Sequence, residues 1–201
     1  MHVSLLPKSS EPRSGRDDDA ARRRSQNGLG RVPGPAARRE WAMILSEPGL
    51  MQWGKRVGRE VRAPVFLGLR GPLGAGKSVF ARAVARGAGV EGPVPSPTFN
   101  LLFRYPTGRG CDLVHMDLYR VEDAGELWEL GWEEIGLRGE IVLVEWPERA
   151  GGLLPGDRWE VDLAAPEPGS HLREVRVTSF GLPPNLPGFP FGQLPEGTEG
   201  G

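Results

Sequence analysis

Hydrophobic residues occur in short runs along this chain, and their spacing predicts alternating helices and strands. After Ser46, a typical helix-capping residue, apolar side chains recur at intervals of three and four. These are Leu50, Trp53, Val57 and Val61. The next run, residues 65–69, is apolar throughout, which is typical of a strand buried on both faces of a sheet. Residues 78–85 then predict a second helix, which ends at Gly87 or Gly89.

The second half of the domain predicts more strands. After a proline-broken loop at 91–98, apolar runs predict strands at 99–105, 113–117 and 141–145. An acidic helical stretch lies at 124–135, and its helical spacing places Trp128, Trp132 and Ile135 in the core. Segments 159–163 and 172–178 alternate polar and apolar residues, which predicts an antiparallel edge hairpin with one wet face. Strands separated by helices indicate an α/β fold with a mainly parallel sheet.

Composition divides the 201 residues into a core and two tails. Residues 1–40 carry 9 Lys+Arg and 5 Asp+Glu with hardly any periodic apolar pattern, so we expect a disordered basic extension. Such a tail can contact RNA or a partner, or it can be an extension ahead of a true beginning at Met43. Residues 182–201 hold 5 Pro and 5 Gly and predict a second disordered tail. The domain proper is then residues 41–181.

Charge and composition exclude several classes of protein. A net charge of -1 and a pI near 6.3 exclude the strongly basic footprint of a protein that grips nucleic acid by charge alone. The single cysteine, Cys111, excludes a disulfide framework or a cysteine-rich zinc site. No apolar run approaches the ~18 residues of a membrane span. We therefore expect a cytoplasmic protein without membrane contact.

The segment GPLGAGKS, Gly71 to Ser78, matches the phosphate-binding pattern G-x-x-x-x-G-K-[ST] between a predicted strand and a predicted helix. Its glycines let main-chain amides face a phosphate at the start of the helix. Lys77 adds a cation for the β- and γ-phosphates, and the Ser78 hydroxyl suits Mg²⁺. This pattern predicts a nucleoside triphosphate site. Its binding residues are Gly71, Leu73, Gly74, Ala75, Gly76, Lys77 and Ser78, with Thr98 from the next motif.

Two predicted strands end in an acid, Asp117 and Glu145, at the edge where ligands bind in open α/β sheets. One of them would hold Mg²⁺ and the other would position the attacking water, and the sequence leaves open which does which. Metal coordination is therefore assigned to Ser78, Asp117 and Glu145, and catalysis to Lys77, Asp117 and Glu145. His115 shares a strand face with Asp117, and we interpret it as structural.

Three neighbouring features remain open. Thr98, in the SPTF segment, is either a switch that senses the γ-phosphate or part of an ordinary Ser-Pro turn. Arg120 either neutralises charge on the phosphoryl group or pairs with Asp117 or Glu122. Trp146 either covers the site or packs in the core, and core packing is the simpler interpretation.

Taken together, GPLGAGKS, SPTF (96–99), HMDLYR (115–120) and VEWPER (144–149) resemble the TsaE (YjeE) family of small bacterial P-loop ATPases. The resemblance covers roughly Ser46 to Thr178. It implies a P-loop NTPase fold that binds ATP and Mg²⁺ and acts with the TsaB–TsaD complex in threonylcarbamoyladenosine modification of tRNA. TsaD would transfer the group, and tRNA would be reached through the complex. Ser78 stands where the family usually has threonine, which keeps the hydroxyl.

The same motif implies Lys77 and Ser78 at the phosphate and Mg²⁺, Asp117 and Glu145 in metal coordination and hydrolysis, and Thr98 in the switch. A small-molecule kinase is the main alternative, with Asp117 as base, although only Arg120 and Arg138 are available between residues 118 and 140 for a lid. A GTPase would need the guanine-reading N-K-x-D, which the sequence lacks. A nucleotide-sensing module without turnover is a further alternative.

Overall fold

The computed structural model describes residues 39–188. The predicted N-terminal extension, apart from its last two residues, lies outside this range, and so does the predicted C-terminal tail from residue 189 onward.

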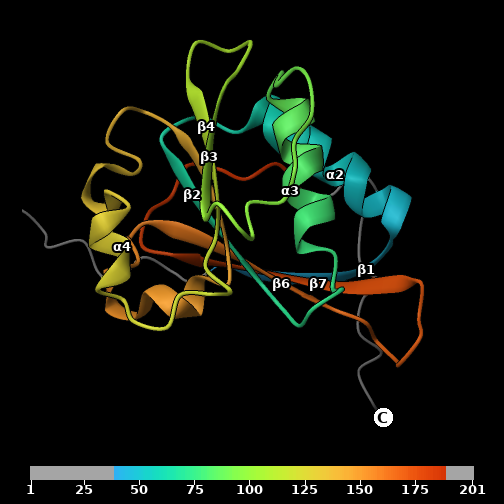
Figure 1. Cartoon of the computed structure of the whole chain (residues 1–201). Helices are drawn as coiled ribbons and strands as arrows, with labels where there is room; N and C mark the ends of the chain where they lie inside the picture. Colours follow the sequence, from blue (N-terminus) through green and yellow to red (C-terminus); the bar gives the residue numbers. More distant parts are fainter. Residues whose placement is uncertain (1–38, 189–201) are drawn as a thin grey trace, which may run out of the picture. The chain divides into compact units, whose positions relative to one another are not determined.

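One seven-stranded sheet organises the described chain, in the order β1-β7-β6-β2-β5-β4-β3 (Figure 1). Its strands are β1 (Glu40–Ser46), β2 (Val65–Arg70), β3 (Leu102–Pro106), β4 (Asp112–Asp117), β5 (Ile141–Glu145), β6 (Arg158–Ala164) and β7 (Leu172–Phe180). The central strands β6, β2, β5 and β4 are parallel, whereas β1, β7 and β3 join antiparallel at the two sides. The α/β fold with a parallel core is therefore confirmed.

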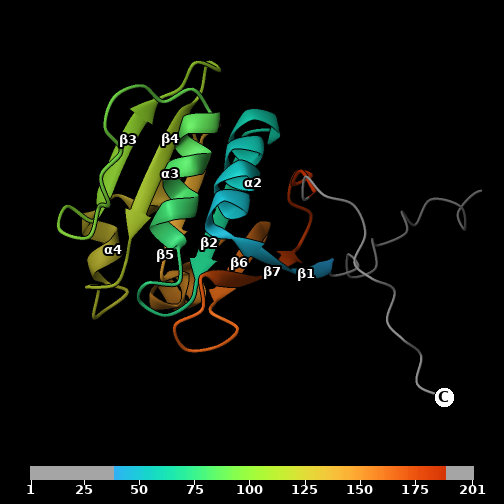
Figure 2. The same cartoon turned by 90° about the vertical axis from the view of Figure 1, so that its right-hand side faces the viewer.

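Helices cover both faces of the sheet (Figure 2). They are α2 (Glu47–Glu60), α3 (Lys77–Gly87), α4 (Glu126–Glu129) and the 3₁₀ segments η1 (Trp132–Glu134) and η2 (Pro147–Leu153). Helix α2 begins as predicted, because the Ser46 hydroxyl accepts a hydrogen bond from the Gly49 amide at 3.3 Å. No helix within residues 39–188 is long and apolar enough to cross a membrane.

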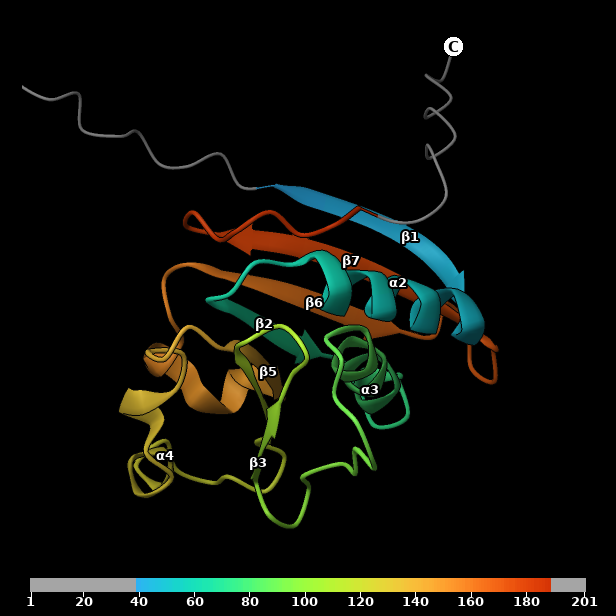
Figure 3. The same cartoon turned by 90° about the horizontal axis from the view of Figure 1, so that it is seen from above.

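The two sides of the sheet have separate hydrophobic clusters. Figure 3 shows α3 on one side of the sheet and α4 on the other. Helices α2 and α3 pack with Leu67 and Leu69 of β2 on one side. On the other side, Phe66 of the same strand packs with Leu127 and Trp132. Strand β2 is thus buried on both faces, as its apolar sequence predicted, and this anchors the loop that follows it.

Three elements differ from the expectations. Strand β1 was not predicted; it pairs with β7, so the predicted β6–β7 hairpin lies inside the sheet rather than at its edge. Residues 98–100 form a turn, and strand β3 starts only at Leu102. The acidic helix breaks at Gly131, which adopts a left-handed φ of 73°, and Trp128 is 51% exposed rather than in the core.

The first part of the predicted C-terminal tail, residues 182–188, runs along the core. The indole of Trp159 donates a hydrogen bond to the carbonyl of Pro184 at 2.8 Å, and that of Trp53 donates to Pro187 at 3.1 Å. Leu186 is buried in the cluster beside α2 and α3. The described fold therefore extends past the boundary expected at residue 181.

Candidate nucleotide-binding site

The loop from Gly71 to Ser78 connects the carboxyl end of β2 to the start of α3. Gly71, Gly74 and Gly76 have φ angles of 127°, 77° and 106°, which side-chain-bearing residues rarely adopt. A Cβ on Gly71 would also lie 2.0 Å from the carbonyl oxygen of Leu163. The glycines of the motif are therefore required by the backbone path between β2 and α3.

Lys77 is buried and folds back over this loop. Its Nζ donates hydrogen bonds to the carbonyl oxygens of Gly71 at 2.7 Å and Pro72 at 2.8 Å. The same ammonium group lies 3.9 Å from the ring centroid of Trp146. Burial lowers the pKa of Lys77, and the carboxylate of Glu145 opposes that shift. The side chain is thus held by neutral acceptors and a ring, which bind a cation more weakly than a phosphate does.

Asp117 and Glu145 lie opposite each other at the ends of neighbouring strands β4 and β5. Both carboxylates are buried. Glu145 uses its two oxygens differently: Oε2 accepts a hydrogen bond from the Ser78 hydroxyl at 2.9 Å, and Oε1 lies 2.9 Å from Nε2 of His115. Glu145 therefore links Ser78, at the start of α3, to His115 of β4.

Asp117 is connected to the SPTF segment. Its Oδ2 accepts a hydrogen bond from the Thr98 hydroxyl at 2.7 Å, and its Oδ1 accepts one from the Tyr119 amide at 3.0 Å. The Ser96 hydroxyl lies 3.0 Å from that of Thr98. These contacts attach the turn at residues 98–100 to the carboxyl end of β4.

The structure thus brings five of the candidate side chains to one edge of the sheet: Lys77, Ser78, Thr98, Asp117 and Glu145. The other five loop candidates are the three glycines described above together with Leu73 and Ala75. Leu73 is 69% exposed at the tip of the loop, and Ala75 is buried beneath it.

Two aromatic residues, Trp146 and Tyr119, lie near the site, and only Trp146 was considered from the sequence. Trp146 has a left-handed φ of 60°, which places its ring against Lys77, and the ring of Tyr119 lies 5.0 Å from it. Sequence analysis missed Tyr119, and its position two residues after a strand-ending acid was the available signal. Arg120 lies over the ring of Phe99, at 5.0 Å from the ring centroid.

The chemistry of these donors suits Mg²⁺. The Ser78 hydroxyl and the carboxylates of Asp117 and Glu145 are oxygen ligands, which Mg²⁺ prefers. The described residues contain no group of three or more His, Cys, Asp or Glu that could hold a metal ion by itself. Mg²⁺ usually binds through one or two protein oxygens together with phosphates and water, so the residues fit an ion that arrives with a nucleotide.

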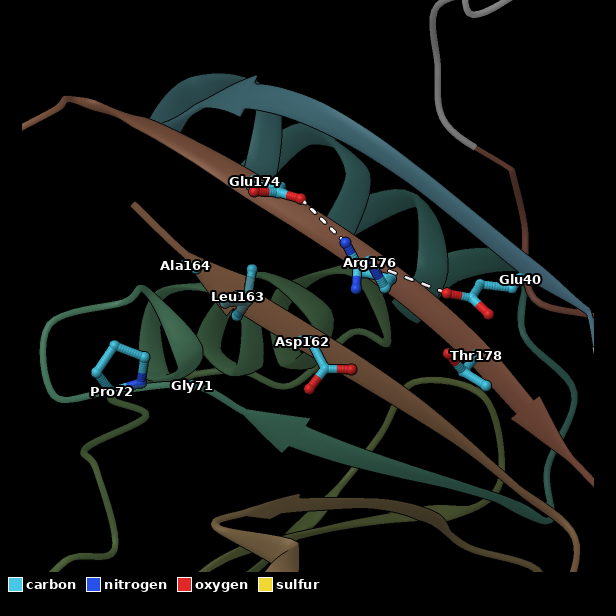
Figure 4. A pocket seen from close by; sticks show the side chains of 9 residues that line it. All are labelled: Glu40, Gly71, Pro72, Asp162, Leu163, Ala164, Glu174, Arg176 and Thr178. Atoms are coloured by element: carbon cyan, nitrogen blue, oxygen red, sulfur yellow. Dashed lines mark hydrogen bonds and ion pairs between the residues drawn. The ribbon is translucent and has the colours of Figure 1, made fainter. Parts of the chain in front are cut away.

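A separate cavity of about 430 Å³ lies behind the loop, against Gly71 and Pro72 (Figure 4). Its walls come mainly from β6 and β7 and carry an ion-pair ladder in which Arg176 lies 3.3 Å from Glu174 and 3.8 Å from Glu40. This cavity shares Gly71 with the candidate site but includes none of its charged side chains.

Comparisons with known proteins agree with this arrangement. The family model described as "Threonylcarbamoyl adenosine biosynthesis protein TsaE" matches residues 45–174. The tRNA threonylcarbamoyladenosine biosynthesis protein TsaE of Streptomyces coelicolor is 34% identical over 135 residues, which are 66% of this chain and 91% of that protein. The protein of the same name from Bacillus subtilis is 37% identical over 115 residues, 57% of this chain and 70% of that protein.

Solved structures give the same result. The crystal structure of YdiB from Bacillus subtilis superposes with a TM-score of 0.59 at 27% identity, covering 72% of this chain and 86% of that one. The family match spans more than half of the chain and includes every candidate side chain. The chain therefore belongs to the TsaE family, whose role is in tRNA threonylcarbamoyladenosine biosynthesis.

Proposed function

We propose that this chain binds Mg-ATP at the Gly71–Ser78 loop and hydrolyses it in support of the TsaB–TsaD complex. The observation that carries the proposal is the convergence of a buried lysine, a hydroxyl and two buried carboxylates at the mouth of a glycine-shaped loop. Binding and hydrolysis of a Mg-triphosphate need this combination of groups: a cation and main-chain amides for the phosphates, and oxygen ligands for Mg²⁺.

Phosphate binding is assigned to the loop and the start of α3. The amides of the loop and the positive end of the helix dipole attract an anion there. Lys77 would exchange its bonds to the Gly71 and Pro72 carbonyls for stronger, charge-assisted bonds to phosphate oxygens. Because the lysine is already buried at the loop, this exchange needs only a local rotation of its side chain.

The hydrogen bonds support an assignment of which residues hold the metal and which orients water. Bound Mg²⁺ would supply charge neutralisation on the phosphates. Ser78 would hold it, together with Glu145, because their side chains are already in direct contact. Asp117 is held by Thr98 instead, so we assign it to orienting the attacking water, with Thr98 reporting the presence of the γ-phosphate.

The partner assignment rests on the family. The net charge of -1 gives the chain little electrostatic attraction for RNA, which supports an indirect route to tRNA through TsaB–TsaD. In this scheme TsaD transfers the threonylcarbamoyl group, and the ATPase supports its cycle.

The test is ATP hydrolysis by the full-length chain with Mg²⁺, with and without TsaB–TsaD. Glu145→Gln keeps the size of the side chain and removes its charge, so turnover should fall by about 100-fold or more while Mg-ATP binding persists. Glu133→Gln, an exposed acid of η1, is the matched control and should hydrolyse at the wild-type rate. Wild-type turnover in Glu145→Gln would remove this residue from the mechanism. Absence of turnover in the wild-type chain under both conditions would refute the ATPase assignment.

A further inference from the structure

His115 is a fully buried titratable side chain in the middle of the candidate site. It lies in β4, where the backbone register places it opposite Leu143 of β5 and Phe103 of β3. Its Nε2 lies 2.9 Å from Oε1 of Glu145. Its other ring nitrogen, Nδ1, is also buried and has no hydrogen-bond partner among the described residues.

The contact with Glu145 indicates which ring nitrogen donates a hydrogen bond. A carboxylate can only accept, so the nitrogen facing Glu145 must carry the hydrogen. A second hydrogen on the buried Nδ1 would be a donor without an acceptor, which is costly in a protein interior. The geometry therefore favours a hydrogen on Nε2, the nitrogen that faces Glu145.

The contact fixes the rotation of the Glu145 carboxylate. With Oε1 bound to His115, Oε2 is the oxygen that faces the Ser78 hydroxyl. A carboxylate bound through Ser78 alone could rotate about its last side-chain bond, because the two oxygens are chemically equivalent. The ring is fully buried on β4, which is paired with a strand on each side.

We propose that His115 is a positioning residue, which holds Glu145 through Nε2–H so that the second carboxylate oxygen stays at the metal-binding hydroxyl of Ser78. This inference rests on the proposed ATPase function. Among the described residues, His115 has no hydrogen bond to the backbone of residues 71–78 or to Lys77, so we expect it to act through Glu145 and mainly on the rate of hydrolysis.

The first test compares His115→Leu with His115→Gln in the full-length chain. Leucine fills the space without a donor, so kcat should fall by about 10–100-fold, the usual effect of removing an outer partner of a metal ligand. The KM for Mg-ATP should stay within about twofold. The amide of glutamine can reach the position of Nε2, and His115→Gln should recover most of the wild-type kcat.

The second test needs no nucleotide. The ¹⁵N NMR spectrum of the ligand-free chain should show the His115 imidazole with its hydrogen on Nε2, assigned by its loss in His115→Gln. The Nε2 resonance should move in Glu145→Gln and stay unchanged in Thr98→Ala, since Thr98 contacts Asp117 and not Glu145. Thermal unfolding of each variant shows whether it is folded, and His115→Gln carries the comparison if His115→Leu is not.

The outcomes separate the two proposals. A wild-type rate in His115→Leu, equal losses in both variants, or an Nε2 without a hydrogen would each overturn the positioning role while leaving the ATPase assignment intact. A wild-type chain that does not hydrolyse ATP would overturn the proposed function, and with it the hydrolytic role of His115, even if the NMR tautomer is as expected.

Discussion

Lys77 is the side chain on which the proposed nucleotide binding most directly depends. It is buried, it is held by two loop carbonyls, and burial lowers its pKa, so it contributes little to the stability of the ligand-free fold. Saturating Mg-ATP should therefore raise the melting temperature of the wild-type chain but not that of Lys77→Ala. That increase is expected to be roughly 5–10 °C at about 100 times the Kd.

Differential scanning fluorimetry with and without Mg-ATP measures this effect. Lys55→Ala, which removes an exposed lysine of α2, should keep the full wild-type increase. An equal increase in Lys77→Ala would show that the loop is not where the nucleotide binds.

Which site residues could be predicted depends on whether their interactions are local in sequence. The loop from Gly71 to Ser78 was predictable because the spacing of its glycines is a local pattern. Asp117 and Glu145 were predictable because parallel strands bring their carboxyl ends to one edge. The contact between His115 and Glu145 was not, because it joins residues 30 apart through a register that no local pattern specifies. For the same reason, the sequence could not show that Ser78 bonds to Glu145 whereas Thr98 bonds to Asp117.

Secondary structure elements show the same distinction. Strands β2 and β5 were predictable because burial on both faces leaves only apolar residues. Strand β1 was not predictable, because it is held at the sheet edge by pairing with β7, more than a hundred residues away. The predicted acidic helix failed at Gly131, since its apolar spacing could not reveal a left-handed turn there.

The contact between helices α2 and α3 gives a prediction about stability. A Cβ on Gly58 would lie 1.9 Å from the carbonyl oxygen of Val84, so the two backbones touch at this glycine. Gly58→Ala should therefore lower the free energy of unfolding by about 1–3 kcal/mol, because overpacking outweighs the better helix propensity of alanine. Chemical denaturation monitored by tryptophan fluorescence measures the change.

Gly49→Ala in the same helix is the matched control. Its Cβ would meet the Ser46 hydroxyl at 3.4 Å, an ordinary contact, so stability should stay the same or rise slightly. If both variants lost the same stability, close packing at Gly58 would not be the cause, because Gly49 lacks such a backbone contact.

The function of the whole molecule can be tested only with its proposed partners. If ATP hydrolysis supports the TsaB–TsaD cycle, each TsaB–TsaD complex should modify more than one tRNA only when this chain and hydrolysable ATP are both present. Asp117→Asn separates binding from turnover, because Asp117 contacts Thr98 and Tyr119 rather than the phosphate-binding loop. Modified tRNA per TsaB–TsaD complex, measured over time, should therefore stop near one with Asp117→Asn and continue with the exposed control Glu133→Gln. Continued modification with Asp117→Asn would mean that nucleotide binding alone drives the cycle and that hydrolysis by this chain has another purpose.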